Sequence, residues 1–275
     1  MKLFSTALLF ALISQLAYSQ SEKIPYGNNP AVGKYFDVGD AKLYYEIYGT
    51  GEPFVLLHGG VYGYIDEFEP FINELSKKYQ VICVATRGHG KSEIGNAPFT
   101  WQQRAEDAYK VVHSITQKPF YLLGFSDGGY SAYKLAAIHP ELVKKLIVIG
   151  ASDRPKGNPP SVADYTAEKL LGQSKDFFEG RLALMPEPNR WNECLQKLNK
   201  LYNEDYLSKE TFEKIKSPTL VMSGEKDGYH TVEHVKRASE MIKGSQLHIV
   251  KNCDHVVFFC DWADVWGSVS SFLNK

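Results

Sequence analysis

The sequence predicts an α/β protein whose sheet is mostly parallel. Short apolar runs, typical of buried strands, alternate with longer segments whose apolar residues recur at helical spacing, and the alternation resumes after one long interruption. Strands that alternate with helices need crossover connections, which place consecutive strands parallel in one sheet. We therefore predict eight strands flanked by helices, with a helical cap inserted between the sixth and seventh strands.

Six of the predicted strands precede the interruption. Residues 42–48 alternate apolar and polar side chains, as a half-buried strand does, and Gly39-Asp40 suits a turn that joins them to a strand over 34–38. Four apolar runs follow, connected by three amphipathic segments. The predicted strands are 54–57, 81–84, 120–123 and 146–149, and the predicted helices are 65–79, 101–115 and 130–138.

Residues 151–217 break the alternation, because they hold polar, proline-containing and amphipathic pieces without an obvious buried strand. An unstructured loop of this length is improbable inside a compact domain. We therefore predict a helical cap over about 151–217, within one domain that spans residues 20–275. The alternation then resumes with a strand over 220–222, a helix over 232–242, a strand over 247–250 and a helix over 264–273.

Residues 1–19 have the pattern of a secretory signal peptide. Lys2 precedes an apolar run over 3–13, and Ala17 and Ser19 are small residues at the positions that cleavage requires. The run is shorter than the roughly 20 apolar residues that span a bilayer. We expect cleavage after Ser19 and export of a mature chain without a membrane span, to the periplasm or the extracellular space. The alternative is a buried amphipathic N-terminal helix.

The composition argues against several classes of partner. The 275 residues carry 31 Lys and Arg against 32 Asp and Glu, and a formal net charge of −1 does not favour binding to nucleic acid or to an anionic membrane surface. The sequence has no metal-ligand spacing of the CxxC or HxxxH kind, and no flavin or nucleotide signature. We predict no metal, no cofactor, and a small molecule as the partner; the oligomeric state stays open.

Export would permit disulfides among four cysteines. Cys83 lies inside an apolar strand-like run, which is typical of a buried thiol. Four cysteines allow three full pairings, and a single bridge is also compatible with the sequence. The cysteines are Cys83, Cys194, Cys253 and Cys260.

A candidate nucleophile directly follows the strand over 120–123. Residues 124–129, GFSDGG, have the Gly-x-Ser-x-Gly arrangement between a strand and a helix. A serine on such a tight turn has a strained backbone, and glycines two positions away relieve the crowding around it. The turn also places the Ser126 hydroxyl at a helix N-terminus, where backbone N–H groups stabilise negative charge. We predict that Ser126 is catalytic rather than part of a purely structural turn.

The base and the acid that a catalytic serine needs are predicted at the same edge of the sheet. Among the eight histidines, His255 follows the last predicted strand, and Asp227 follows the strand over 220–222. Because the carboxyl ends of parallel strands meet at one edge, we expect both side chains to lie beside Ser126. The neighbouring acids Glu225 and Asp254 are the alternatives to Asp227.

These motifs resemble those of the α/β-hydrolase family, and the resemblance covers essentially everything after residue 33. That family orders its triad Ser…Asp…His along the chain, as Ser126, Asp227 and His255 are ordered here. The resemblance implies an α/β-hydrolase fold in which Ser126 attacks, His255 takes and returns the proton, and Asp227 orients the imidazole.

The same resemblance implies an oxyanion hole made of two main-chain N–H groups. One belongs to Asp127, the residue after the nucleophile. The other belongs to Gly60 in the HGGV loop over 58–61, with Val61 as the alternative donor. We expect His58 to form structural hydrogen bonds rather than to act as a base.

The turn over residues 87–92 resembles the family's Arg-Gly-x-Gly-x-Ser element, which we interpret as structural. Relatives usually carry an aspartate two residues before the arginine, where this chain has Ala85. The departure concerns a local contact of Arg87 and not the catalytic assignment.

Residues 124–129 and MSGEKD over 222–227 are most similar to the branch that contains valacyclovir-hydrolase-like esterases. The similarity implies a serine esterase that cleaves small carboxylic esters, with aminoacyl esters and amides among the candidates, through an acyl-serine intermediate. The Asp127 carboxylate would then pair with a substrate ammonium. The alternative is that it points outward and caps the following helix.

Other functions share this machinery. C–C-bond hydrolases of the meta-cleavage type and cofactor-free haloperoxidases are the enzymatic alternatives, and a ligand-binding receptor on the same fold is the non-enzymatic one. Such receptors often lack a triad member, whereas all three are present here. Apolar cap residues either pack within the cap or line an acyl pocket, and helical spacing favours packing. These residues are Tyr165, Phe177, Phe178, Leu182, Leu184, Met185 and Trp191.

Overall fold

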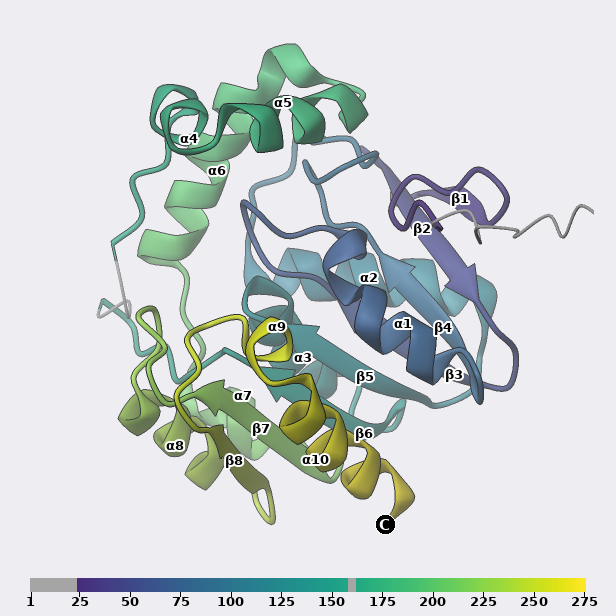
Figure 1. Cartoon of the computed structure of the whole chain (residues 1–275), viewed down its shortest axis with the longest axis vertical. Coiled ribbons are helices and arrows are strands. Elements are labelled where there is room, and N and C mark those ends of the chain that lie inside the picture. The colour runs from purple at the N-terminus through teal and green to yellow at the C-terminus, as the bar shows by residue number, and fades with distance from the viewer. Residues whose placement is uncertain (1–23, 158–161) are drawn as a thin grey trace, which may run out of the picture.

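The computed structural model describes residues 24–157 and 162–275, so the predicted signal peptide over 1–19 lies outside the described residues (Figure 1). One mixed sheet has the strand order β1-β2-β4-β3-β5-β6-β7-β8. The β1–β2 and β2–β4 pairs are antiparallel, and the remaining pairs are parallel. The strands are β1 (Gly33–Asp37), β2 (Lys42–Tyr48), β3 (Glu52–Leu57), β4 (Tyr79–Val84), β5 (Phe120–Phe125), β6 (Val143–Ile149), β7 (Thr219–Gly224) and β8 (Gln246–Val250). The predicted mostly parallel sheet of eight strands is confirmed.

Helices cover both faces of this sheet (Figure 1). One face packs against α2, α3 and α8 around side chains such as Val111, Leu135 and Val235. The other face packs against α1, α9 and α10 around Phe71 and Val269. These helices are α1 (Glu69–Leu75), α2 (Trp101–Ile115), α3 (Asp127–Ile138), α8 (Val232–Met241), α9 (Val257–Cys260) and α10 (Trp262–Asn274). Within the described ranges, no helix combines the length and the apolar character that crossing a membrane requires.

The predicted helical insertion lies between β6 and β7. Its helices α4 (Ala167–Gln173), α5 (Lys175–Leu184) and α6 (Trp191–Glu204) form the layer at the top of Figure 1. The next helix, α7 (Lys209–Glu213), packs instead on α3, where the rings of Phe212 and Tyr133 lie 5.0 Å apart. The first three helices therefore form the cap, whereas α7 covers the sheet.

The helix predicted over 65–79 is shorter in the structure. A 3₁₀ turn over Ile65–Phe68 precedes α1, and Tyr79 already begins β4. Pro70 explains the break, because proline has no N–H and its ring clashes with the carbonyl one turn earlier, so it is tolerated only in the first turn of a helix. The short helix α9 was not predicted at all.

The parallel strands determine where the candidate site lies. β5 occupies the middle of the sheet between β3 and β6, and Ser126 follows it directly. Asp227 follows β7 and His255 follows β8, which run parallel to β5. The three residues therefore emerge at the same edge of the sheet.

Candidate active site

Ser126 lies on the turn between β5 and α3. Its φ of 53° and ψ of −115° form a conformation that residues other than glycine rarely adopt. Its N–H donates to the carbonyl of Ile149 at 2.8 Å, which ties the turn to β6. Gly124 and Gly128 leave the space that the turn needs, because a Cβ atom on Gly128 would collide with the main-chain carbonyl of Leu57. The strained turn therefore depends on glycine at these positions.

The side chains of Ser126, His255 and Asp227 form a continuous chain of hydrogen bonds. The Ser126 hydroxyl donates to His255 Nε2 at 2.9 Å, and His255 Nδ1–H donates to Asp227 Oδ2 at 2.8 Å. Asp227 Oδ1 accepts the N–H groups of Tyr229 and His230 at 2.8 and 3.0 Å. Burial raises the pKa of Asp227, but the hydrogen bond and charge of His255 outweigh burial and hold the pKa below its usual value. The acid is therefore ionised where it can orient the imidazole.

Glu225 and Asp254, the alternative acids, bind main-chain groups instead. Asp254 Oδ1 accepts the N–H groups of Gly228 and His255 at 3.2 and 2.7 Å. Glu225 Oε2 accepts the N–H of Asn252 at 2.9 Å. Both carboxylates stabilise the loop, whereas the ring of His255 is bonded to Asp227.

The two N–H groups predicted for the oxyanion hole lie beside Ser126. Asp127 begins α3, so its N–H is one of the free donors of a helix N-terminus. In the described part of the chain, neither this N–H nor that of Gly60 donates to an acceptor. A Cβ atom on Gly60 would collide with the Tyr202 hydroxyl and lie 2.8 Å from Asp127 Oδ2, so the loop approaches the nucleophile turn closely. Val61, the alternative donor, has a strained φ of 42°.

Ser126 opens into a cavity of about 1110 Å³ whose wall comes from both the sheet edge and the cap. Tyr165 and Phe177 of the cap line this cavity. Phe178 and Met185 are instead buried in the apolar core, as helical spacing favours. Across residues 24–157 and 162–275, no group of three or more His, Cys, Asp or Glu side chains is arranged to hold a metal ion.

A family model described as the alpha/beta hydrolase fold matches residues 52–190, a segment that includes the Ser126 turn. The chain belongs to the α/β-hydrolase family. It is 26% identical over 276 residues to the serine hydrolase BPHL of Mus musculus, an alignment that covers 90% of this chain and 88% of the relative. The human BPHL is 28% identical over 247 residues, with 79% of this chain and 78% of the relative covered.

Solved structures share the fold of this hydrolase. A serine hydrolase involved in carbazole degradation superimposes with a TM-score of 0.74 over 88% of this chain and 98% of the other, at 20% identity. An esterase from Exiguobacterium antarcticum superimposes with a TM-score of 0.69 over 88% of this chain and all of the other, at 26% identity. The chain is therefore a hydrolase of α/β fold, with esterases among the proteins it resembles.

The side chain of Asp127 points into this hydrolase and not outward as one prediction had it. It is 3% exposed, and its Oδ2 lies 2.8 Å from Arg104 Nη1 and accepts the Tyr202 hydroxyl at 3.0 Å. Burial raises the pKa of Asp127, and the positive charge of Arg104 opposes that rise. The Asp127 carboxylate is therefore paired with Arg104 inside the protein, whereas its pairing with a substrate ammonium stays a prediction.

Two polar side chains support the loop that carries Gly60. Glu67 Oε1 accepts the N–H of Gly59 at 2.5 Å, and burial raises the pKa of this carboxyl to about 8. His58 Nδ1–H donates to the carbonyl of Gly59 at 2.7 Å, and His58 Nε2 accepts the N–H of Thr86 at 2.9 Å. Burial lowers the pKa of His58 to about 3, so the imidazole is neutral and structural.

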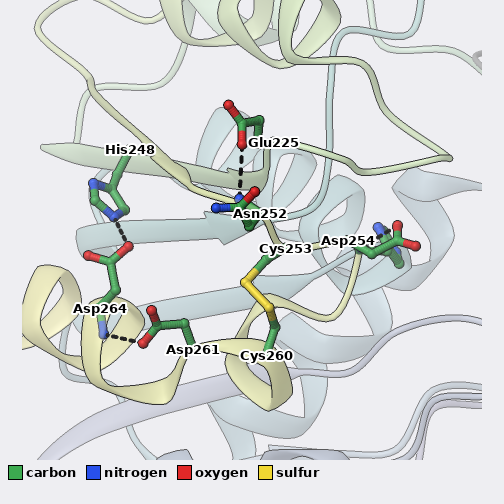
Figure 2. The surroundings of a disulfide bond; sticks show 9 residues. Glu225, His248, Asn252, Cys253, Asp254, Cys260, Asp261 and Asp264 are labelled. Carbon is green, nitrogen blue, oxygen red and sulfur yellow. Dashed lines mark hydrogen bonds and ion pairs between the residues drawn. A yellow bond between two sulfur atoms is a disulfide. The ribbon is translucent and has the colours of Figure 1, made fainter.

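A disulfide encloses the loop that carries His255. Cys253 and Cys260 are bonded (Figure 2). His255 lies between them in the chain, so the base is inside a covalent loop that ends in α9. Cys253 is buried and Cys260 is exposed, while Cys83 and Cys194 are buried free thiols. The sequence left this pairing open because it does not show which cysteines lie close in space.

The arginine of the predicted structural turn is buried between two acids. Arg87 Nη2 lies 2.8 Å from Asp40, and its Nε lies 2.6 Å from Asp107. Arg87 is therefore paired with two carboxylates although position 85, where relatives usually carry an aspartate, holds alanine.

Sequence analysis missed several polar residues of the cavity. Arg104, which does not line the cavity but pairs with Asp127, had a usable signal, because a charged residue on the largely apolar face of a helix indicates a buried partner. Arg154, His230 and Tyr202 gave no such signal, since their positions in connections and in the cap are typical of solvated loops and of helix packing.

Proposed function

We propose that this hydrolase cleaves small carboxylic esters through an acyl-serine intermediate. The observation that carries the proposal is the bonded chain Ser126–His255–Asp227 at a cavity, with the free N–H groups of Gly60 and Asp127 beside it. A serine esterase needs these parts together: a nucleophile, a base, an orienting acid and two oxyanion donors.

In this mechanism Ser126 Oγ attacks the ester carbonyl carbon while His255 Nε2 takes the hydroxyl proton. The N–H groups of Gly60 and Asp127 stabilise the negative oxygen of the tetrahedral intermediate. The intermediate collapses to an acyl-serine as His255 returns the proton to the departing alcohol. Water, deprotonated by the same imidazole, then releases the acid and restores Ser126.

Intact-mass labelling with a fluorophosphonate tests this function. We expect one adduct on the wild-type protein and none on S126A or H255A, because only an activated serine reacts quickly with the probe. Ser174 also lines the cavity, so S174A is the matched control and should be labelled like the wild type. A folded wild-type protein that is not labelled would overturn the proposal and favour the ligand-binding receptor.

We also propose that the mature chain is exported. The pattern of residues 1–19 supports this, and so does the Cys253–Cys260 disulfide, because disulfides persist in oxidising compartments. Expression of the full chain in a Gram-negative host should yield periplasmic protein that begins at residue 20. Cytoplasmic protein that retains residues 1–19 would overturn the proposal.

A further inference from the structure

Two arginines in the wall of the cavity differ in their partners. Arg181 forms a two-pronged ion pair with Asp66, with its Nη1 and Nη2 2.7 and 2.9 Å from the two carboxylate oxygens. Arg154 is 4% exposed, and no carboxylate in the described ranges lies within ion-pair distance of it. Its Nε donates to the main-chain carbonyl of Asp205 at 3.2 Å, and its Nη2 donates to that of Tyr202. These partners are neutral, so among the described residues Arg154 has no carboxylate bonded to it.

The acids around Arg154 are already occupied by other groups. Asp127 is close enough to interact electrostatically with Arg154, but Arg104 pairs with it directly. Two buried guanidinium groups thus share one buried carboxylate. Asp127 is paired with Arg104 (2.8 Å) and Asp153 with Arg237 (2.8 Å). The Asp205 carboxylate is directed to the main-chain N–H groups of Trp101 (2.7 Å) and Tyr206 (2.8 Å) and not to Arg154.

The surroundings of Arg154 hold its guanidinium in place. It lies over two aromatic rings, with its central carbon 5.2 Å from the centre of Tyr130 and 5.6 Å from that of Trp101. Tyr130 follows Ser126 by one helical turn of α3, so this positive charge belongs to the same cavity as the nucleophile. Rigid, partly desolvated guanidinium groups bind carboxylates more strongly than exposed ones do. Such a group loses little conformational entropy on binding, and less water screens the attraction between the two charges.

The histidine at this end of the cavity brings no charge. His230 is buried against Tyr130 and Ser152, with its Nδ1 3.2 Å from Ser152 Oγ. Burial lowers the pKa of His230 to about 3, so the ring is neutral near pH 7. A buried cation without a counter-ion is costly, and a negative ligand would remove that cost.

We propose that Arg154 binds a carboxylate carried by the substrate, so that the hydrolase prefers anionic esters, such as half-esters of dicarboxylic acids, over neutral or cationic ones. This substrate preference rests on the proposed esterase function. It also runs against an aminoacyl preference, because an ammonium group would meet an unpaired arginine and an Asp127 that Arg104 already neutralises.

Three methyl esters of one chain length test the preference: monomethyl glutarate, methyl pentanoate and methyl 5-aminopentanoate. We expect kcat/KM of the wild type to be about 10- to 100-fold higher for the carboxylate ester than for the neutral one. This is the fold-change that one hydrogen bond to a charged group contributes. R154M should bring this ratio close to one. R154K keeps the charge and should retain part of the preference.

R181M/D66N is the matched control, because it removes the other arginine of the cavity together with the carboxylate that neutralises it. It should keep the ratio of the wild type. A ratio that R181M/D66N lowers as much as R154M would overturn the assignment to Arg154, and so would a wild type that treats both esters alike. No turnover of the carboxylate ester by a protein that the fluorophosphonate still labels would overturn the anion site alone. Absence of labelling would instead overturn the esterase function.

Discussion

The two halves of the candidate active site are held in different ways. Ser126 follows a strand in the middle of the sheet, and the main chain alone sets its position through the strained turn and the bond to Ile149. His255 follows β8, the strand at the sheet edge, and lies in a loop. The nucleophile is therefore positioned by the fold itself, whereas the base needs further support.

That support comes from side chains and one covalent bond. The Asp227 carboxylate accepts the His255 Nδ1–H, and the Cys253–Cys260 disulfide closes the loop around the base. The comparison indicates that changes on the base side act on catalysis while the fold persists, and that changes in the nucleophile turn act on the fold as well. Each prediction below tests one side of this difference.

Removing the acid should have the largest effect. D227N keeps the shape of the side chain but presents an amide to His255, which favours the wrong tautomer of the imidazole. We expect kcat to fall by about 10⁴-fold, as loss of a triad carboxylate does elsewhere, with little change in the melting temperature. Steady-state ester hydrolysis and thermal unfolding measure the two effects.

E225Q is the control for D227N, since Glu225 lies near the same place but binds only the N–H of Asn252. Its kcat should stay within a few-fold of the wild type. If E225Q were as damaging as D227N, the orienting role would not belong to Asp227.

On the nucleophile side, G128A should cost stability. The added Cβ meets the main-chain carbonyl oxygens of Leu57 and His58, which cannot move without disturbing β3 and the loop after it. Overpacking of this kind costs about 1–3 kcal/mol or more, so unfolding in urea should occur at a lower midpoint.

The control is G172A in α4, where no atom lies within 4 Å of the added Cβ and alanine should stabilise by about 0.5–1 kcal/mol. Equal effects of the two changes would contradict the close packing of the turn.

The same difference explains what the sequence predicted well. Ser126, Asp227 and His255 could be chosen from chain order alone, because each follows a strand and parallel strands share a direction. The interruption by α4, α5 and α6 was visible as a break in periodicity. Features determined by the main chain and by strand order therefore leave a local pattern in the sequence.

Features made by side chains from distant segments leave no such pattern. The Arg104–Asp127 pair joins α2 to α3, and the lack of a carboxylate bonded to Arg154 follows only from where the described carboxylates lie in space. The Cys253–Cys260 bridge is one of several pairings that are compatible with the sequence. The break at Pro70 is different, because the proline itself predicts a helix start there although the apolar spacing runs on across it.

The disulfide should have a smaller effect than the acid, and mainly on the base side. Its loss in the C253S/C260S variant frees a short loop, with an expected cost of about 2 kcal/mol in unfolding free energy. We expect kcat to fall and KM to rise, because the loop holds the base and also lines the cavity through Val256 and Phe259. Dithiothreitol should bring the wild type to the same rate, since Cys260 is exposed. It should leave the double variant unchanged. A reductant effect that persists in the double variant would point to another thiol.

Glu67, which supports the oxyanion loop on the nucleophile side, should make the stability depend on pH. In the folded protein burial raises its pKa from about 4.5 to about 8, so between these values the unfolded chain loses a proton that the folded one keeps. The contribution of Glu67 to the unfolding free energy therefore falls as pH rises from 4.5 to 8 and is level above that range.

E67Q retains an acceptor for the Gly59 N–H but cannot ionise. Urea unfolding should thus show E67Q gaining stability relative to the wild type between pH 5 and pH 8.5, with E225Q as the control for a general Glu→Gln effect. A difference between E67Q and wild type that does not change with pH would show that Glu67 is ionised in the folded protein. The oxyanion loop would then be held by a charged hydrogen bond, and the nucleophile side would depend on a side chain much as the base side does.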